Sequence, residues 1–187
     1  MSPKPSVAEK LCLTCGLCCN GVIFADVQLQ KGDDPTKLEA IGLRISCVSK
    51  RKAAQGLPLK SEAAVPKRKF PQPCAAFDGC HCRIYADRPR YCREFDCALL
   101  KSVNAGEVKT TEALRTIEKA RKRAEKVRQL LRQIGDKDEQ VALSLRFRRT
   151  AKRMQQINLD QPTSHLFGEL TLAVHDLNLL LSERFYS

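Results

Sequence analysis

The sequence has no tryptophan, two methionines and an aromatic content of only 5%. It also lacks any long run of apolar residues, whereas a helix needs about 20 of them in succession to cross a bilayer. The first residues contain no apolar stretch of the kind found in signal peptides. These absences argue against a membrane-spanning protein, and we expect the chain to act in the cytoplasm without a membrane contact.

Cysteine and proline are almost absent from the second half of the chain. All ten cysteines lie between Cys12 and Cys97, and Pro162 is the only one of nine prolines that follows residue 97. Prolines interrupt helices and are common in loops. This contrast predicts two parts, a loop-rich cysteine module over residues 1–105 and a basic helical region over residues 106–187.

The second part has the periodicity of amphipathic helices, with apolar residues three and four positions apart. Three helices are predicted, from Leu114 to Ile134, from near Asp136 to Met154, and from Pro162 to Leu181. Thr110 or Thr111 can cap the first helix, and Gly135 can end it. The residues of the second helix expected to face inward are Val141, Leu145, Ala151 and Met154. Short connections between the helices predict a small antiparallel bundle.

The first part contains only short elements. Residues 21–27 have the pattern of a strand, residues 35–43 that of a short helix, and residues 68–72 and 81–85 could pair as a hairpin. Residues 50–69 are basic and contain one glycine and two prolines, so we expect an exposed loop there. Short strands followed by long helices predict an α+β fold that is mainly α.

The cysteines are the strongest chemical signal. Disulfides do not persist in a reducing compartment, so clustered cysteines there indicate metal ligation or redox chemistry. The first cluster, Cys12, Cys15, Cys18 and Cys19, has the spacing C-x2-C-x2-C-C. Two-residue spacers let successive sulfurs converge on one centre, and Gly16 allows a close turn of the backbone. The adjacent side chains of Cys18 and Cys19 tend to diverge, so one of them could serve a second metal or a neighbouring iron.

A second cluster follows after a long gap and consists of Cys74, Cys80, Cys82, Cys92 and Cys97. Four thiolates complete the shell of a tetrahedral zinc or of one cubane iron–sulfur cluster. The two clusters together therefore allow either two sites of four sulfurs or one larger polynuclear site. Cys47 stands alone, and we expect it to be an incidental thiol.

The cysteine module has few large apolar side chains with which to build a core. A structural zinc contributes about 10–16 kcal/mol in small zinc modules, whereas a whole domain is stable by only about 5–15 kcal/mol. Metal would therefore dominate the folding of this module. We expect the module to be disordered without metal, while the helices persist.

These residues resemble the YkgJ-type cysteine-cluster family, a zinc- or iron-chelating domain. The resemblance is carried by the C-x2-C-x2-C-C opening, by Cys74, and by Cys82-Arg-Ile-Tyr-x-x-Arg-Pro-x-x-Cys92-Arg-x-Phe. It implies that zinc or iron binds through eight cysteines, namely Cys12, Cys15, Cys18, Cys19, Cys74, Cys82, Cys92 and Cys97. Cys80 and the basic helical region lie outside the family pattern.

Three residues between the later cysteines could support such a centre. Arg88 and Arg93 could offset the negative charge of a thiolate centre or donate hydrogen bonds to sulfur. Tyr85 could pack its ring over the site, although a place in a small core would suit it equally. Pro89 can begin a helical turn that positions Cys92.

The residues leave the metal and the activity open. The C-x2-C-Gly segment resembles a zinc knuckle, whereas the x2, x2 spacing with a distant fourth cysteine resembles ferredoxin ligation. A similar cysteine cluster occurs in flagellin lysine-methylating enzymes, where it is linked to an iron–sulfur centre. The leading interpretation is a metal-binding protein. The alternative is an iron–sulfur-dependent oxidoreductase or protein-modifying enzyme, for which no catalytic residue stands out.

The region from Arg115 to Arg153 is strongly basic, with 14 Lys and Arg against five Asp and Glu. Such a face attracts nucleic-acid phosphates or an acidic protein, so a nucleic-acid-binding module with a structural metal is the second alternative. Neutralising Arg146, Arg148 and Arg149 should weaken such binding. Aromatic residues are scarce here, and a solvated bundle face explains the charge more simply.

Overall fold

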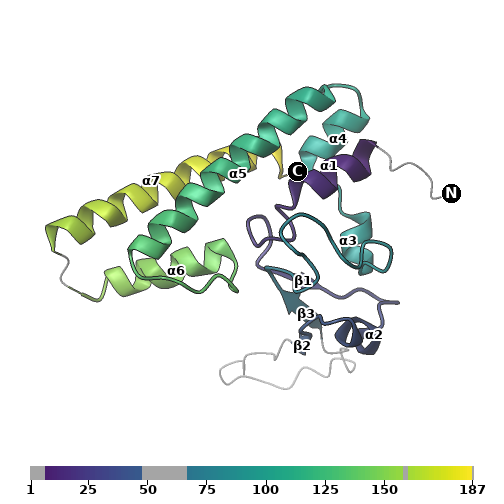
Figure 1. Ribbon diagram of the computed structural model, residues 1–187, viewed down its shortest axis with the longest axis horizontal. Coiled ribbons are helices and arrows are strands. Elements are labelled where there is room, and N and C mark those ends of the chain that lie inside the picture. The colour runs from purple at the N-terminus through teal and green to yellow at the C-terminus, as the bar shows by residue number, and fades with distance from the viewer. Residues whose placement is uncertain (1–6, 48–66, 158–159, 187) are drawn as a thin grey trace, which may run out of the picture.

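The computed structural model describes residues 7–47, 67–157 and 160–186. Across these ranges, seven helices accompany one small three-stranded sheet, so the fold is α+β and mainly α, as the sequence predicts (Figure 1). In chain order the elements are α1 (Val7–Cys15), β1 (Asp26–Gln28), α2 (Pro35–Ala40), β2 (Ser46–Cys47), β3 (Arg68–Pro71), α3 (Arg90–Glu94), α4 (Ala98–Asn104), α5 (Thr110–Gln133), α6 (Leu143–Met154) and α7 (Gln161–Arg184).

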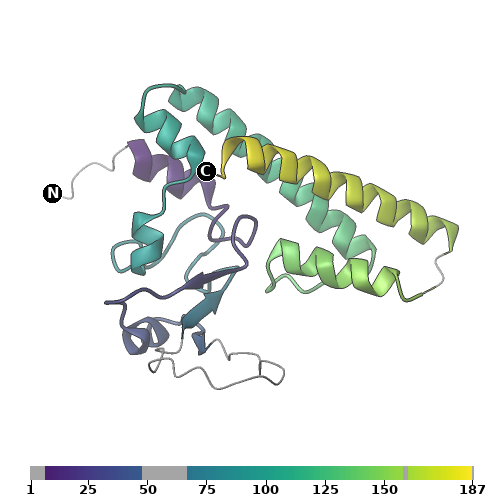
Figure 2. The ribbon, with the colours of Figure 1, turned by 180° about the vertical axis from the view of Figure 1, so that it is seen from behind.

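The long helices α5 and α7 lie side by side and run in opposite directions, and α6 packs against the C-terminal half of α5 (Figures 1 and 2). The buried stripe of α5 contains small residues such as Ala120 and Ala124, which let α7 approach closely. Opposite them, α7 buries Leu170, Ala173 and Leu177. The predicted first and third helices are therefore confirmed.

The ends of these helices differ in detail from the prediction. The N-cap of α5 is Lys109, which makes no side-chain capping bond, so Thr110 and Thr111 are the first helical residues and not the cap. Leu114 is 39% exposed and lies outside the buried stripe. At the start of α7, the side chain of Asp160 accepts a hydrogen bond from the backbone N–H of Thr163.

The predicted second helix begins too early, because α6 starts at Leu143 and not near Asp136. The reason is Arg146 of α6, whose side chain is only 1% exposed and is enclosed by the loop that joins α5 to α6. Its guanidinium donates to the Asp136 carboxylate, to the Asp136 carbonyl and to Glu139. Residues 136–139 wrap around this side chain and cannot be helical. Leu145, predicted to face inward, is 38% exposed on the opposite side of α6.

The small sheet has the order β1-β3-β2, and both pairs are antiparallel. Val27 pairs with Phe70, and both side chains are buried. The predicted hairpin between residues 68–72 and 81–85 is wrong, since β3 pairs with β1 and β2 and residue Cys82 forms only an isolated bridge with Phe77. The predicted strand over residues 21–27 is reduced to its last two residues. The predicted helix over 35–43 is confirmed as α2.

Two hydrophobic cores stabilise the fold. The larger core joins α5 and α7 to Leu11, Leu17 and Val22 of the N-terminal segment and to Leu99 and Leu100 of α4. The smaller core lies beneath the sheet and contains Val27, Leu38, Leu43, Phe70, Cys74 and Ala76. The division at residues 105 and 106 stays a prediction, and the larger core draws on both sides of it.

Two expectations concern other segments. Most of the exposed loop expected at residues 50–69 falls outside the described residues, while Arg68 and Lys69 belong to β3. Among the helices that the structure describes, none is both long enough and apolar enough to span a bilayer.

Candidate metal centre

A largely apolar cavity of about 120 Å³ lies where α1 and the turn after it meet the segment that contains α3 and the start of α4. The cysteines that line it are Cys12, Cys15, Cys18, Cys19, Cys80, Cys82, Cys92 and Cys97. Cys74 is buried next to this cavity in the smaller core. The fold thus gathers sulfurs from both sequence clusters into one region, although they are far apart in the chain.

Local structure explains how each cysteine reaches this region. Cys12 and Cys15 lie on α1, and a tight turn follows in which the Gly16 carbonyl accepts hydrogen bonds from the N–H groups of Cys19 and Asn20. Pro89 is the N-cap of α3, which holds Cys92, as the sequence predicts. Cys97 is the N-cap of α4.

Four of the cysteines form a first thiol group: Cys12, Cys15, Cys18 and Cys97. Cys12 is exposed as a residue, but desolvation of its sulfur, reinforced by the charge of Cys97, raises the pKa of the Cys12 thiol to about 11. Burial raises the pKa of Cys15 to about 12, and Cys97 and Cys12 add to the effect. The pKa of Cys18 is raised well above its ordinary value by burial and by its neighbours Cys15, Cys19, Cys97 and Cys12, in that order. These four thiols therefore lie within electrostatic range of one another.

The other four predicted ligands form a second thiol group: Cys19, Cys74, Cys82 and Cys92. The pKa of Cys19 is raised to about 12. Burial is the largest cause, and the charges of Cys74, Cys82 and Cys92 are the next causes, in that order. Burial also raises the pKa of Cys92 to about 12, with Cys74 and Cys82 as the next causes. Without a nearby cation, the thiols with raised pKa values in both groups are protonated and neutral near pH 7.

Backbone N–H groups hydrogen-bond to three of these sulfurs. The N–H of Leu17 does so at Cys15, those of Ala76 and Phe77 at Cys74, and those of Leu99 and Leu100 at Cys97. Each such bond lowers the pKa of the thiol and favours the thiolate, which opposes the larger effect of burial. Donors of this kind surround the sulfurs of metal–thiolate sites.

Arg88 lies between the two thiol groups. Its charge lowers the pKa of both Cys12 and Cys92, against the larger effect of burial. The guanidinium stands 3.5 Å from the centre of the Tyr85 ring, and its Nε donates to the Tyr85 carbonyl over 2.8 Å. Tyr85 and Arg88 both line the cavity, whereas Arg93 is exposed on α3.

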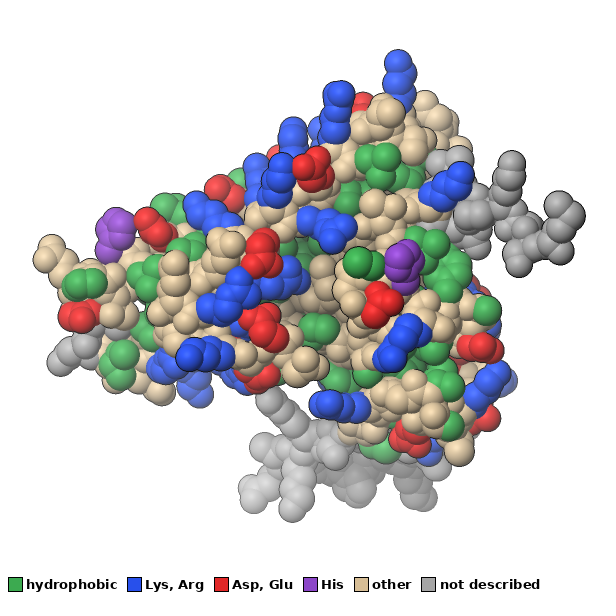
Figure 3. Space-filling model, in the orientation of Figure 1, with side chains coloured by type: hydrophobic (Ala, Val, Ile, Leu, Met, Phe, Trp, Pro, Cys, Tyr) green, Lys and Arg blue, Asp and Glu red, His purple; other side chains and the backbone are tan. Residues whose placement is uncertain are grey.

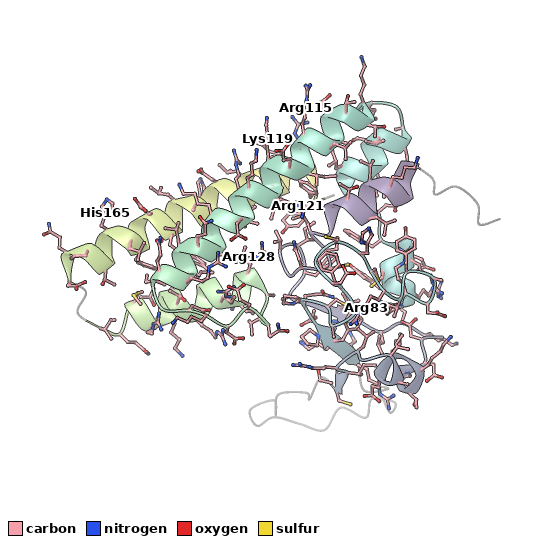
Figure 4. All side chains as sticks on the ribbon, in the orientation of Figure 1. Arg83, Arg115, Lys119, Arg121, Arg128 and His165 are labelled. Atoms are coloured by element: carbon pink, nitrogen blue, oxygen red, sulfur yellow. The ribbon has the colours of Figure 1, made fainter. Side chains whose placement is uncertain are left out.

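Two arginines that the sequence alone did not single out hold the first cysteine cluster in place. Arg121 donates to the Thr14 carbonyl over 3.0 Å, and Arg128 donates to the Asn20 carbonyl over 3.4 Å. Figure 4 shows both on the side of α5 that faces the cysteine segment, while Arg115 and Lys119 project from the other side. Arg121 and Arg128 are seven residues apart, which is about two helical turns, so they lie on one face of α5. This spacing is the sequence signal that could have identified them.

The remaining cysteines have different surroundings. Cys80 is exposed in a turn where the Asp78 carboxylate accepts from the N–H groups of Cys80 and His81. His81 is exposed as well. Cys47 is exposed on β2, and it is not one of the residues that line the cavity.

The side chains do not form a ready-made ligand shell. In the described part of the chain, no three or more His, Cys, Asp or Glu side chains are arranged so that they could hold a metal ion. All ten cysteines are free thiols. The structure therefore brings the eight predicted ligands into one region but leaves the question of metal ligation to the chemistry of the groups.

Gly16 offers a test of how tightly the two cysteine segments pack. Its φ is +64°, and a Cβ there would lie 2.6 Å from the ring of Phe77, which also lines the cavity. We expect Gly16→Ala to suffer backbone strain of about 1–3 kcal/mol and overpacking of about 1–3 kcal/mol. Gly32→Ala is the matched control, because Gly32 also has a positive φ but a Cβ there would meet no described atom within 4 Å.

Denaturant unfolding of the two variants measures the difference. Gly16→Ala should lose clearly more stability than Gly32→Ala, and it should bind less metal. Equal losses in the two variants would show that the Phe77 ring moves aside freely, and that the turn does not fix the distance between the segments.

Any function must be inferred from the thiols and their surroundings. Comparison of the chain with family models, with curated proteins and with solved structures finds no match.

Proposed function

We propose that this protein binds metal, and that its cysteine module chelates zinc or iron through Cys12, Cys15, Cys18, Cys19, Cys74, Cys82, Cys92 and Cys97. The observation that supports the proposal most strongly is the gathering of these thiols, from two distant segments, around one buried apolar region. An incidental set of cysteines would be scattered over the fold.

The electrostatics favour a soft cation over a set of permanently neutral thiols. Burial and mutual repulsion raise the thiol pKa values, and a bound dication offsets both because its charge stabilises the thiolates directly. The backbone N–H groups at Cys15, Cys74 and Cys97 already favour the charged sulfur. All-sulfur ligation suits zinc, iron and iron–sulfur clusters alike.

Ligation would require the thiol side chains to turn toward a common point. Metal binding and folding are commonly coupled in small metal modules, so a loose arrangement without metal is compatible with a tight one in its presence. The smaller core is consistent with this view, because it has fewer buried side chains than the larger core.

On the cysteine motif we also propose membership of the YkgJ-type family, and a location in the cytoplasm, where thiols stay reduced. The nucleic-acid alternative loses part of its basis. Arg146 is buried in ion pairs with Asp136 and Glu139, and Arg149 pairs with Asp138, so neither is a free surface charge. Lys and Arg side chains do cover the visible face of α5 and α6, interspersed with acidic residues (Figure 3).

Metal analysis of protein purified without exposure to air tests the proposal. We expect at least one metal per chain, with a colourless protein if the metal is zinc and a brown one, bleached by dithionite, if it is an iron–sulfur cluster. Cys47→Ser should retain the full metal content, because Cys47 lies away from the cavity. A well-folded protein with clearly less than one metal per chain would contradict the proposal.

A further inference from the structure

We propose that the eight thiols form two separate metal centres, and that the peptide bond between Cys18 and Cys19 divides them. The first centre takes the first thiol group, and the second centre takes the second thiol group. This inference rests on the proposed metal binding and assigns its ligands. Each centre would hold one thiophilic unit with four sulfur ligands, either a single zinc or iron ion or one cubane cluster.

The two thiol groups pack against different cores. Cys15 and Cys97 pack against the larger core, which joins α1 and α4 to α5 and α7. Cys74 belongs to the smaller core beneath the sheet, and Cys19 and Cys92 pack against it. Although sulfurs of both groups line one cavity, a single shared ion would draw its ligands from segments fixed to different cores, whereas one centre for each group lies beside its own core.

Backbone hydrogen bonds also tie Cys19 and the first thiol group to different parts of the fold. The Cys19 carbonyl accepts a hydrogen bond of 2.8 Å from the N–H of Cys74, which ties Cys19 to the segment after β3. The N–H of Ala98, next to Cys97, donates to the Phe185 carbonyl at the end of α7, so Cys97 is fixed to the helical part. Cys18 lies near that end too, because its charge contributes to the raised pKa of Tyr186, after burial.

The electrostatic neighbours of the thiols give the same division. The strongest thiol neighbour of Cys18 is Cys15, followed by the adjacent Cys19 and then by Cys97 and Cys12. The strongest thiol neighbours of Cys19 are Cys74, Cys82 and Cys92. The influences that cross between the groups run only through Cys15, Cys18 and Cys19, as expected for centres joined by one short turn.

Each thiol group also has its own arginine. The charge of Arg121 favours the thiolate at Cys15, and that of Arg83 favours it at Cys74, while Arg88 acts on both groups. A centre with four thiolates and one dication carries a net charge of about −2. Two such centres a short distance apart would repel each other, and Arg88 lies where it reduces that repulsion.

Cobalt titration of the full chain under anaerobic conditions tests the assignment, because cobalt–thiolate sites absorb strongly. The wild-type protein should bind about two cobalt ions. Cys97→Ser should lose the first centre and keep the second, and Cys92→Ser should do the reverse, so each variant should keep about half the thiolate absorption. The double variant should lose nearly all of it, and Cys47→Ser should match the wild type.

The outcomes separate this inference from the proposed function. Loss of all cobalt in either single variant, or four or more metals bound in one cooperative step, would mean one shared polynuclear site, and only the division would be overturned. A wild-type chain that binds neither cobalt nor zinc would overturn the proposed function itself. Should a variant fail to fold, the wild-type stoichiometry still decides between about two independent ions and any other count.

Discussion

Removing metal from the purified protein should unfold the cysteine module and leave the α5–α7 helices folded. The smaller core has fewer buried side chains than the larger core, so we expect the sheet and α2 to depend on the proposed second centre. A structural metal contributes about 10–16 kcal/mol in small modules, which exceeds or equals the total stability of about 5–15 kcal/mol usual for a domain. The larger core retains the Ala, Leu and Ile contacts between α5 and α7, which need no metal.

Hydrogen exchange measures this difference along the chain. After chelation under reducing conditions, amides of β1 and β3 should exchange as fast as those of an unfolded chain, while amides near Ala120 and Leu177 should keep most of their protection. Circular dichroism should show that most of the helix signal remains.

Cys47→Ser should respond to chelation in the same way as the wild type, since its thiol lies away from the cavity. Sheet amides that stay protected in a fully metal-free protein would show that the apolar contacts of Val27, Leu38 and Phe70 suffice. The module would then not depend on metal for its fold.

The parts of the fold that follow local rules could be predicted from the sequence. The stripes of α5 and α7 repeat with the helical period over many turns, so their existence and inner faces follow from the sequence alone. The turn of α3 at Pro89 is equally local. The pairing of β3 with β1 was missed because strand partners are set by burial of Val27 and Phe70 together, which requires knowledge of the tertiary structure.

The candidate site shows the same limit. The resemblance to the YkgJ-type family implied the eight thiols, but the proposed division into two groups could not be foreseen, because it depends on which core each segment meets. Arg121 and Arg128 belong to a basic stretch that suggests a solvated surface, and only the packing of α1 on α5 reveals that they hold carbonyls of the cysteine segment. The sequence alone does not reveal whether a long charged side chain will point into water or donate to a backbone carbonyl.

Replacement of Arg146 should cause the largest loss of stability of any single change in the helical region. The Arg146 side chain is 1% exposed, and its ion-pair partner Asp136 is 9% exposed. Without Arg146, the buried Asp136 carboxylate keeps only the longer 3.7 Å contact with the half-exposed Arg149. Loss of one member of a buried pair costs about 3–5 kcal/mol. Arg146→Ala also removes the donor to the Asp136 carbonyl, while Glu139 keeps its ion pair with Arg132. The loop between α5 and α6 therefore loses its central donor.

Urea unfolding of Arg146→Ala and Arg148→Ala provides the matched comparison on one helix. Arg148 is exposed on α6, and a surface substitution of this kind changes stability by about 0.5 kcal/mol or less. The double variant Arg146→Met/Asp136→Asn should recover part of the loss seen in Arg146→Met, because it removes the uncompensated charge as well as the pair. Losses of equal size in Arg146→Ala and Arg148→Ala would mean that Arg146 acts as one more surface charge. Its burial would then not be the reason that residues 136–139 leave the helix.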